Sequence, residues 1–345
     1  MELLKALSQT PGAPGREERV RDLIRQHVEP VADEVTVDAL GNLFAWKRAT
    51  ERTESTRRIM LACHMDEIAF YVRNIDAKGF IRLQKLGGFD VRNLFARRVL
   101  IQTRTGDITA NLNPSGRPVH IQTPEDKGRS TRIIDLIVDT GLPADEVKKR
   151  VQPGDPVTLV GHFEDFGPVV SGKCMDNRVA CWTGIRVLEA LAKLDTLHHD
   201  VCVCFTVQEE IGVRGAIVGG YAVEPDVAIA VDVTLAVDHP GIPEEEQITA
   251  LGQGVAIKVM DSYSISDRGL VDTFIDLAEK NQIKHQLEIL PLGGTDAGAI
   301  QRARGGCKAI TISVPCRYVH TITETVHKED LQGGVDLIVA YIDSP

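Results

Sequence analysis

The sequence predicts an α/β protein whose main domain is interrupted by a smaller β-rich domain. In the second half of the chain, apolar runs of strand length alternate with segments of helical periodicity, which is the α/β pattern. Between about residues 68 and 168 the apolar runs become short and are separated by Gly, Pro and Asp, as in small β domains. A chain of 345 residues with 43% hydrophobic and 26% charged content is long enough for both domains.

The elements before residue 68 follow a breaker-rich stretch at 11–15. Apolar residues at helical spacing predict a surface helix over 16–28. Short apolar or β-branched runs then predict strands at 34–37, 43–46 and 59–63. This part of the chain therefore supplies a helix and three strands to the main domain.

The inserted segment and the second half of the chain differ in texture. The inserted segment has one helical stretch and several short strand signals, at 144–150 and at 68–72, 80–83, 99–103 and 157–160. The second half predicts longer strands at 201–207, 227–231, 255–259, 286–290 and 309–314. Between and around them, helical periodicity predicts helices at 177–194, 268–281, 296–304 and 328–341.

The composition excludes several classes of function. A formal net charge of -10 argues against a protein that binds nucleic acid or anionic membranes, because both functions need a basic surface. The first residues lack the apolar core of a secretory signal, and no run reaches the ~18 uncharged apolar residues of a membrane span. Several of the 7 cysteines lie in apolar runs, which suits a reducing compartment. We therefore expect a cytoplasmic protein with no nucleic-acid or membrane partner.

Two adjacent acids, Glu209 and Glu210, follow the apolar run 201–207 almost directly. Such a pair is often only a solvated turn. In open α/β sheets, however, ligands bind outside the carboxyl ends of the strands, which is where this pair would lie. Because neighbouring side chains cannot share one direction, one acid can bind a metal while the other faces a reacting molecule. The sequence pattern leaves open which acid does which.

Four further polar residues occur at or near the ends of apolar runs or the start of a helix, namely His64, Asp176, Asp232 and His320. Each has an ordinary structural explanation: a hydrogen-bonded histidine, a helix N-cap or a turn residue. Taken with one acid of the pair, they form two imidazoles and three carboxylates, a donor set that suits Zn²⁺ or a similar ion. A bridging carboxylate would let this set hold two ions, and the remaining acid is then a candidate general base.

Asp66 follows the first of these histidines by two residues. Its carboxylate can accept the second ring N–H of His64 and so fix the tautomer of the imidazole. An aspartate in a turn explains the same spacing equally well.

A near match to a phosphate-binding loop runs from Gly167 to Cys174. The final Ser or Thr, whose hydroxyl binds Mg²⁺, is replaced by cysteine, so we interpret the match as accidental. Cys63, Cys174 and Cys316 each lie close in sequence to a candidate ligand, which leaves a role in metal binding or oxidation open. Packing explains these thiols more simply.

Six blocks of the sequence, in order, resemble the signature blocks of the tetrahedral (TET) and glutamyl aminopeptidase family of clan MH, binuclear metallopeptidases that are also labelled cellulase M. The blocks are 63–68, 172–178, 207–216, 231–234, 293–298 and 315–320. The resemblance covers essentially the whole chain. It implies a mixed-sheet catalytic domain with helices on both faces over residues 1–67 and 169–345, and an inserted, barrel-like β domain over residues 68–168.

The resemblance also implies a role for each site residue. It makes His64, Asp176, Glu210, Asp232 and His320 the ligands of two divalent metal ions, with zinc and cobalt as the expected metals, and makes Asp176 the bridge. Glu209 matches the general acid and base, and Asp66 matches the residue that orients His64. The implied reaction removes the N-terminal residue from short or unfolded peptides, with the two ions activating a water whose proton Glu209 accepts.

The resemblance further implies dimers that assemble into a tetrahedral dodecamer, with the inserted domain taking part in assembly. Two alternatives remain open: a hydrolase of other amides or of sugar polymers on the same scaffold, and a non-catalytic assembly protein. The intact ligand set argues against the second alternative, and the sequence shows no paired-carboxylate glycosidase pattern apart from the metal site.

Overall fold

A computed structural model describes residues 1–128 and 130–344, which form two compact units. The larger unit contains Met1–Glu67 and the chain from His162 onward, and the smaller unit is Ile68–Gly161. The smaller unit therefore ends before residue 168, where the sequence analysis placed its boundary. The reason is that β10 (Glu164–Asp165) pairs with β11 (Val169–Gly172), a strand of the larger unit.

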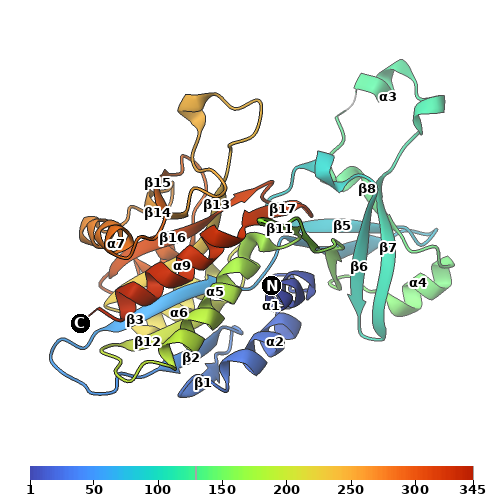
Figure 1. The fold of residues 1–345 in the computed structure, drawn as a ribbon. Coiled ribbons are helices and arrows are strands. Elements are labelled where there is room, and N and C mark those ends of the chain that lie inside the picture. The colour runs from blue at the N-terminus through green and yellow to red at the C-terminus, as the bar shows by residue number, and fades with distance from the viewer. Residues whose placement is uncertain (129, 345) are drawn as a thin grey trace. The chain divides into compact units, whose positions relative to one another are not determined.

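The larger unit is built on an 11-stranded mixed sheet (Figure 1). Its main path runs in the order β1 (Glu34–Val37), β2 (Leu43–Lys47), β12 (Asp200–Thr206), β3 (Arg58–His64), β13 (Val227–Leu235), β16 (Lys308–Arg317), β17 (Glu324–His327), β11 and β10. A branch adds β14 (Val255–Met260), which pairs with β16 and with β15 (His285–Ile289). The central strands β12, β3, β13 and β16 are mutually parallel, so their carboxyl ends lie at one edge.

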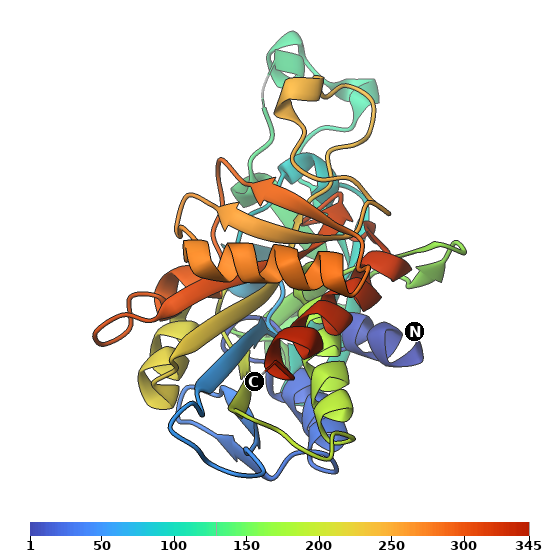
Figure 2. The same cartoon turned by 60° about the vertical axis from the view of Figure 1, so that its left-hand side comes forward.

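Helices cover both faces of this sheet, as the sequence analysis predicted. One core cluster joins the sheet to α1 (Glu2–Gln9), α2 (Glu18–Val28), α5 (Met175–Leu191), α7 (Arg268–Lys280) and α9 (Lys328–Ile342). The other cluster joins it to α6 (Arg214–Val223) and α8 (Asp296–Ile300). Figure 2 shows α7 in orange and α9 in red on the same side of the sheet.

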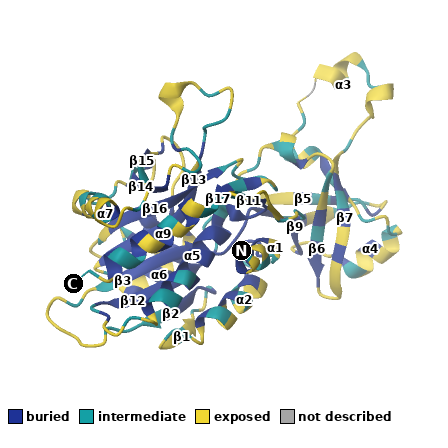
Figure 3. Ribbon diagram, viewed as in Figure 1, coloured by how far each residue is buried: buried dark blue, intermediate teal, exposed yellow. Residues whose placement is uncertain are grey.

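The two clusters arise because successive strand residues point to opposite faces. In β3, Leu61 belongs to the first cluster and Met60 to the second. Strands buried on both faces are therefore apolar at nearly every position, as in β12, where all residues are buried (Figure 3). This is why the sequence shows continuous apolar runs here and not alternation.

The smaller unit contains a closed antiparallel barrel. Its strands follow the order β4 (Ala69–Ile75), β5 (Ile81–Leu86), β8 (Leu136–Asp139), β7 (Gly106–Pro114), β6 (Arg97–Thr103) and β9 (Pro156–Leu159), and β9 closes the barrel on β4. Two helices, α3 (Pro124–Gly128) and α4 (Ala144–Arg150), accompany the barrel. Closure removes exposed strand edges, and the barrel-like domain predicted from the sequence is confirmed.

Helices α6 and α8 differ from the sequence-based prediction. Helix α6 contains Gly215, Gly219 and Gly220, and glycine lowers helix propensity, so its sequence did not predict a helix. It forms because its apolar face packs against α8 and the sheet. The predicted helix at 296–304 ends earlier, at Ile300. Within residues 1–128 and 130–344, none of the helices combines the length and apolarity needed to cross a bilayer.

Candidate metal centre

The residues predicted as ligands meet at the carboxyl edge of the sheet. His64 is the last residue of β3, and Thr206, its partner in register, is the last residue of β12. Because β3 and β12 are parallel, the chain that leaves β12 carries Glu209 and Glu210 towards His64. Asp232 lies near the end of β13, and the remaining two residues, Asp176 and His320, come from the start of α5 and from the loop after β16.

Two groups of three side chains are arranged so that each could hold a cation. In the first group, His64 Nε2 lies 3.2 Å from Asp176 Oδ1 and 3.8 Å from Asp232 Oδ1. In the second group, His320 Nε2 lies 3.4 Å from Asp176 Oδ2 and 3.4 Å from Glu210 Oε2. Within each group, one donor atom per residue lies within 4.8 Å of the others. Asp176 belongs to both groups and directs a different oxygen into each.

At the start of α5, the carboxylate of Asp176 does not cap the helix and can therefore belong to both groups. Asp176 and Asn177 have non-helical backbone angles, so the regular helix begins after them. Asn177 takes the capping role, since its Oδ1 accepts the N–H of Ala180 at 3.2 Å and its Nδ2 donates to the carbonyl of Val231 at 2.9 Å. The capping role that the sequence allowed for Asp176 thus falls to the next residue.

The charge of the site fits a divalent cation. Five carboxylates, from Asp66, Asp176, Glu209, Glu210 and Asp232, surround two imidazoles. Each of these carboxylates is at most 13% exposed, and an excess of negative charge with so little contact with water is unfavourable without a counter-charge. Among residues 1–128 and 130–344, no group forms a hydrogen bond with the buried Oε1 atom of Glu210. Nitrogen and carboxylate oxygen donors are the ligands that zinc and similar ions prefer.

The surrounding carboxylates also raise the pKa values of the two histidines. Burial alone would lower the pKa of His64, but Asp176, Asp232 and Asp66 raise it well above its ordinary value. For His320, burial acts in the same direction, while Asp176 and Glu210 raise the pKa to about 12. Burial raises the pKa of Asp176, yet the two imidazoles bring it below its ordinary value. The site therefore stabilises positive charge at the positions of both imidazoles.

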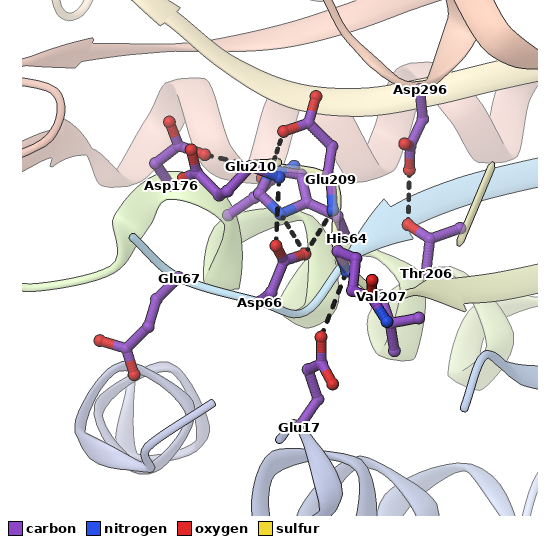
Figure 4. A network of polar contacts seen from close by, with 12 residues as sticks. Glu17, His64, Asp66, Glu67, Asp176, Thr206, Val207, Glu209, Glu210 and Asp296 are labelled. Atoms are coloured by element: carbon purple, nitrogen blue, oxygen red, sulfur yellow. Dashed lines mark hydrogen bonds and ion pairs between the residues drawn. The ribbon is translucent and has the colours of Figure 1, made fainter. Parts of the chain in front are cut away.

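Glu209 stands beside the first group without belonging to either group. Its Oε2 lies 3.9 Å from His64 Nε2. Gln208, which precedes it, has a left-handed backbone conformation with φ of 57°, and the side chains of Glu209 and Glu210 leave the turn in different directions (Figure 4). Burial raises the pKa of Glu209 well above its ordinary value, and the charges of Asp232, Asp296 and Glu210 add to this rise against the opposing effect of His64.

Asp66 is buried beneath this turn and has two kinds of contact. Its Oδ1 lies 3.4 Å from His64 Nδ1, the contact that the sequence analysis proposed. The same oxygen accepts the backbone N–H of Glu209 at 3.0 Å, and Oδ2 accepts that of Glu210 at 3.1 Å (Figure 4). These backbone contacts have no pattern in the sequence that could predict them. Asp66 thus ties His64 to the backbone of both acids.

Replacing Asp66 with asparagine is expected to lower kcat by about 10- to 100-fold, the usual effect of losing such an outer contact. The amide leaves only one oxygen to accept the N–H groups of Glu209 and Glu210, so the turn that carries both acids loses a fixed position. Steady-state kinetics at saturating metal would measure the effect. An unchanged kcat would show that the turn holds its geometry without Asp66.

Two further buried acids near the site were not singled out from the sequence. Glu17 Oε1 accepts the N–H of Gln208 at 3.2 Å, and burial together with the charge of Asp66 raises the pKa of Glu17 to about 8. Asp296 Oδ2 accepts the hydroxyl of Thr206 at 2.5 Å, and burial raises its pKa to about 7. Asp296 lies in 293–298, one of the six blocks that resemble the family signature, so the sequence did contain a signal for it. Glu17 lies in none of these blocks.

The cysteines near the site take part in packing and in several polar contacts. Cys63, Cys174 and Cys316 are buried, and burial raises the pKa of each thiol well above its ordinary value. The thiol of Cys174 donates to Glu67 Oε2 at 2.8 Å, and Lys173 Nζ lies 2.5 Å from the same oxygen. None of these thiols belongs to either cation-holding group among the described residues.

Comparisons with known proteins cover most of the chain. A family model described as M42 glutamyl aminopeptidase matches residues 41–337. The glutamyl aminopeptidase of Lactococcus lactis is 31% identical over 354 residues, which cover 99% of this chain and 95% of that protein. The crystal structure of a TET aminopeptidase from a marine sediment archaeon of the Thaumarchaeota has a TM-score of 0.92 at 31% identity, covering 99% of this chain and 95% of that chain.

A second solved structure adds information on assembly. The Pyrococcus horikoshii TET1 peptidase, which can assemble into a tetrahedron or a large octahedral shell, has a TM-score of 0.86 at 32% identity and covers 99% of this chain and 98% of that chain. The matches extend over both structural units and over every block that carries a candidate site residue. The chain therefore belongs to the M42 glutamyl aminopeptidase family.

Proposed function

We propose that this chain is a metal-dependent aminopeptidase that removes N-terminal residues from short or unfolded peptides. The observation that carries the proposal is the pair of candidate ligand groups that share Asp176, with the carboxylate of Glu209 beside them. A reaction at a peptide bond needs a positioned base together with stabilisation of the developing negative charge. The names of the related proteins support the same reaction class.

The proposal assigns the candidate ligands to two divalent ions. His64, Asp176 and Asp232 hold one ion, and Asp176, Glu210 and His320 hold the other, with zinc or cobalt as the expected metal. When bound, such a pair of ions acidifies water and polarises a carbonyl oxygen. Asp66 keeps His64 in the tautomer that presents Nε2 to the ion, because its carboxylate faces Nδ1.

Glu209 is the general base in this proposal. Its carboxylate accepts a proton from the attacking water and then donates that proton to the nitrogen of the leaving peptide, so the carboxylate is regenerated in each turnover. Burial raises the pKa of Glu209, which makes its carboxylate a stronger base than that of an exposed glutamate. Its side chain is only 13% exposed and lies beside His64, 3.9 Å from Nε2.

The proposal includes self-association. The Pyrococcus relative that forms closed shells covers nearly the whole of this chain, including the barrel unit Ile68–Gly161. We propose that this chain forms dimers that assemble into a tetrahedral dodecamer, and that the barrel unit takes part in the contacts. An enclosed site would select short or unfolded peptides over folded proteins.

A substrate panel tests the proposed function. The purified metal-free protein is incubated with acidic, basic and aliphatic aminoacyl p-nitroanilides, with and without Zn²⁺ or Co²⁺, and a β-glucan serves as a control substrate. We expect release of nitroaniline only when metal is present, and the most rapidly cleaved side chain defines the specificity. Hydrolysis of the glucan alone, or of no substrate, would contradict the proposal.

A further inference from the structure

Glu324 lies next to the candidate metal centre without belonging to either group of candidate ligands. It is the first residue of β17, and its side chain is only 2% exposed. Antiparallel pairing places it opposite Gly172, the last residue of β11, from which the chain continues to the start of α5. Glu324 also follows His320 by four residues. Its position therefore brings it close to two of the three residues in the second group.

Both carboxylate oxygens of Glu324 accept a backbone N–H from a candidate ligand. Oε2 accepts the N–H of Asp176 at 3.0 Å, and Oε1 accepts the N–H of His320 at 2.7 Å. His320 has a φ of 64°, in the left-handed region that non-glycine residues seldom occupy. The bond to Glu324 thus holds His320 in a backbone conformation that it would otherwise rarely adopt.

We propose that Glu324 is a positioning residue that fixes Asp176 and His320 relative to each other, and thereby sets the affinity of the second group for its ion. This inference rests on the proposed function. Glu324 belongs to neither candidate ligand group, so it would act through the backbone of Asp176 and His320, to which it is hydrogen-bonded. Hydrogen-bonded carboxylates that orient metal ligands from outside the ligand set are a general feature of protein metal sites.

The two groups depend on Glu324 to different extents. In the first group, His64 and Asp232 belong to neighbouring strands of the sheet, and the ring of His64 also faces Asp66. Only Asp176 in that group is held by Glu324. In the second group, Asp176 and His320 both depend on it. Loss of Glu324 should therefore lower the affinity of the second group for its ion much more than that of the first group.

The test is the variant Glu324→Gln in the full chain. Its amide offers one acceptor oxygen and one NH₂ group, so one of the two backbone N–H groups loses its acceptor. The metal-free wild type and variant are titrated with Co²⁺ and followed by calorimetry and by the visible absorption of the bound ion. We expect one of the two affinities to fall by about 10- to 100-fold while the other stays close to the wild-type value. Activity should return at high Co²⁺ concentration. Under these conditions kcat should approach the wild-type value, although the affinity for the weakened ion stays low.

A matched control separates this effect from a general loss of stability. Asp330 in α9 is also buried and also joins two backbone N–H groups, those of Gly252 at 2.7 Å and Gly254 at 2.8 Å, in the loop before β14. Asp330→Asn removes the same kind of contact where no candidate ligand depends on it. We expect it to lower the melting temperature without changing either affinity.

A second variant keeps the test informative if Glu324→Gln does not fold. Glu324→Asp retains the charge but is shorter by one methylene, so it cannot reach both N–H groups, and we expect the same selective loss in smaller degree. Two unchanged affinities, or two affinities that fall equally, would overturn the inference. If the wild type binds two ions and cleaves peptides, and the Glu324 variants bind the ions like the wild type, only the inference about Glu324 is overturned. A wild type that binds no ion would overturn the proposed function as well.

Discussion

Replacing Glu209 with glutamine is expected to lower turnover by about 10²- to 10⁴-fold, the usual contribution of a positioned general base. Glutamine has nearly the same shape and cannot accept the proton. Because Glu209 belongs to neither candidate ligand group, the variant should keep its full metal content. Single-turnover rates with a p-nitroanilide substrate, measured beside metal content by mass spectrometry, would show both effects.

The neighbouring acid supplies the control for this experiment. Glu210 Oε2 lies 3.4 Å from His320 Nε2, so Glu210→Gln should lower the affinity for one ion. Activity in that variant should recover in part when metal is added in excess, whereas activity in Glu209→Gln should not. Full turnover in Glu209→Gln would refute its role as the base. Loss of metal in that variant would instead make Glu209 a ligand.

Replacing Asp176 with alanine is expected to remove both ions. Its two oxygens face the two imidazoles at 3.2 and 3.4 Å, so each candidate group loses a member and their shared link disappears. Losing an outer contact to a ligand already lowers metal affinity by about 10- to 100-fold, and losing a bridging ligand should lower it further for both ions. Metal content after dialysis, together with peptidase activity, would measure the effect.

Asp232 provides the comparison for Asp176. It belongs only to the first group, so Asp232→Ala should lower the affinity for one ion and leave the other in place. If Asp176→Ala retained one ion at wild-type affinity, the two groups would be independent and Asp176 would not bridge them. If Asp232→Ala also lost both ions, the assignment of Asp232 to a single group would be wrong.

Much of the fold and the position of the site follow from strand patterns. Apolar runs identify β3, β12 and β13, and parallel strands bring their carboxyl ends to one edge. Polar residues that follow such runs, such as His64 and Glu209, are therefore expected to meet. The resemblance to the family distinguished Glu210 from Glu209, which the pattern alone could not do. The mixed sheet and the inserted barrel agree with these predictions.

The remaining features depend on contacts that have no pattern in the sequence. Glu17 and Glu324 accept backbone N–H groups from residues distant in the chain or across a turn, and every residue except proline offers such a donor. The contacts of Asp66 with the two acids are of the same kind. The boundary at Gly161 depends on the pairing of a two-residue strand, β10, which is too short to give a hydrophobic signal.

Two ions that share Asp176, with Glu209 outside their ligand sets, would be visible in the anomalous diffraction of crystals of the zinc-loaded protein at the zinc edge. We expect two peaks per subunit about 3.5–4 Å apart, the separation typical of paired catalytic ions. His64 and Asp232 should contact one peak, Glu210 and His320 the other, and Asp176 both. A single peak would show that Asp176 does not join two ions, and a peak contacted by Glu209 in place of Glu210 would make Glu209 a ligand.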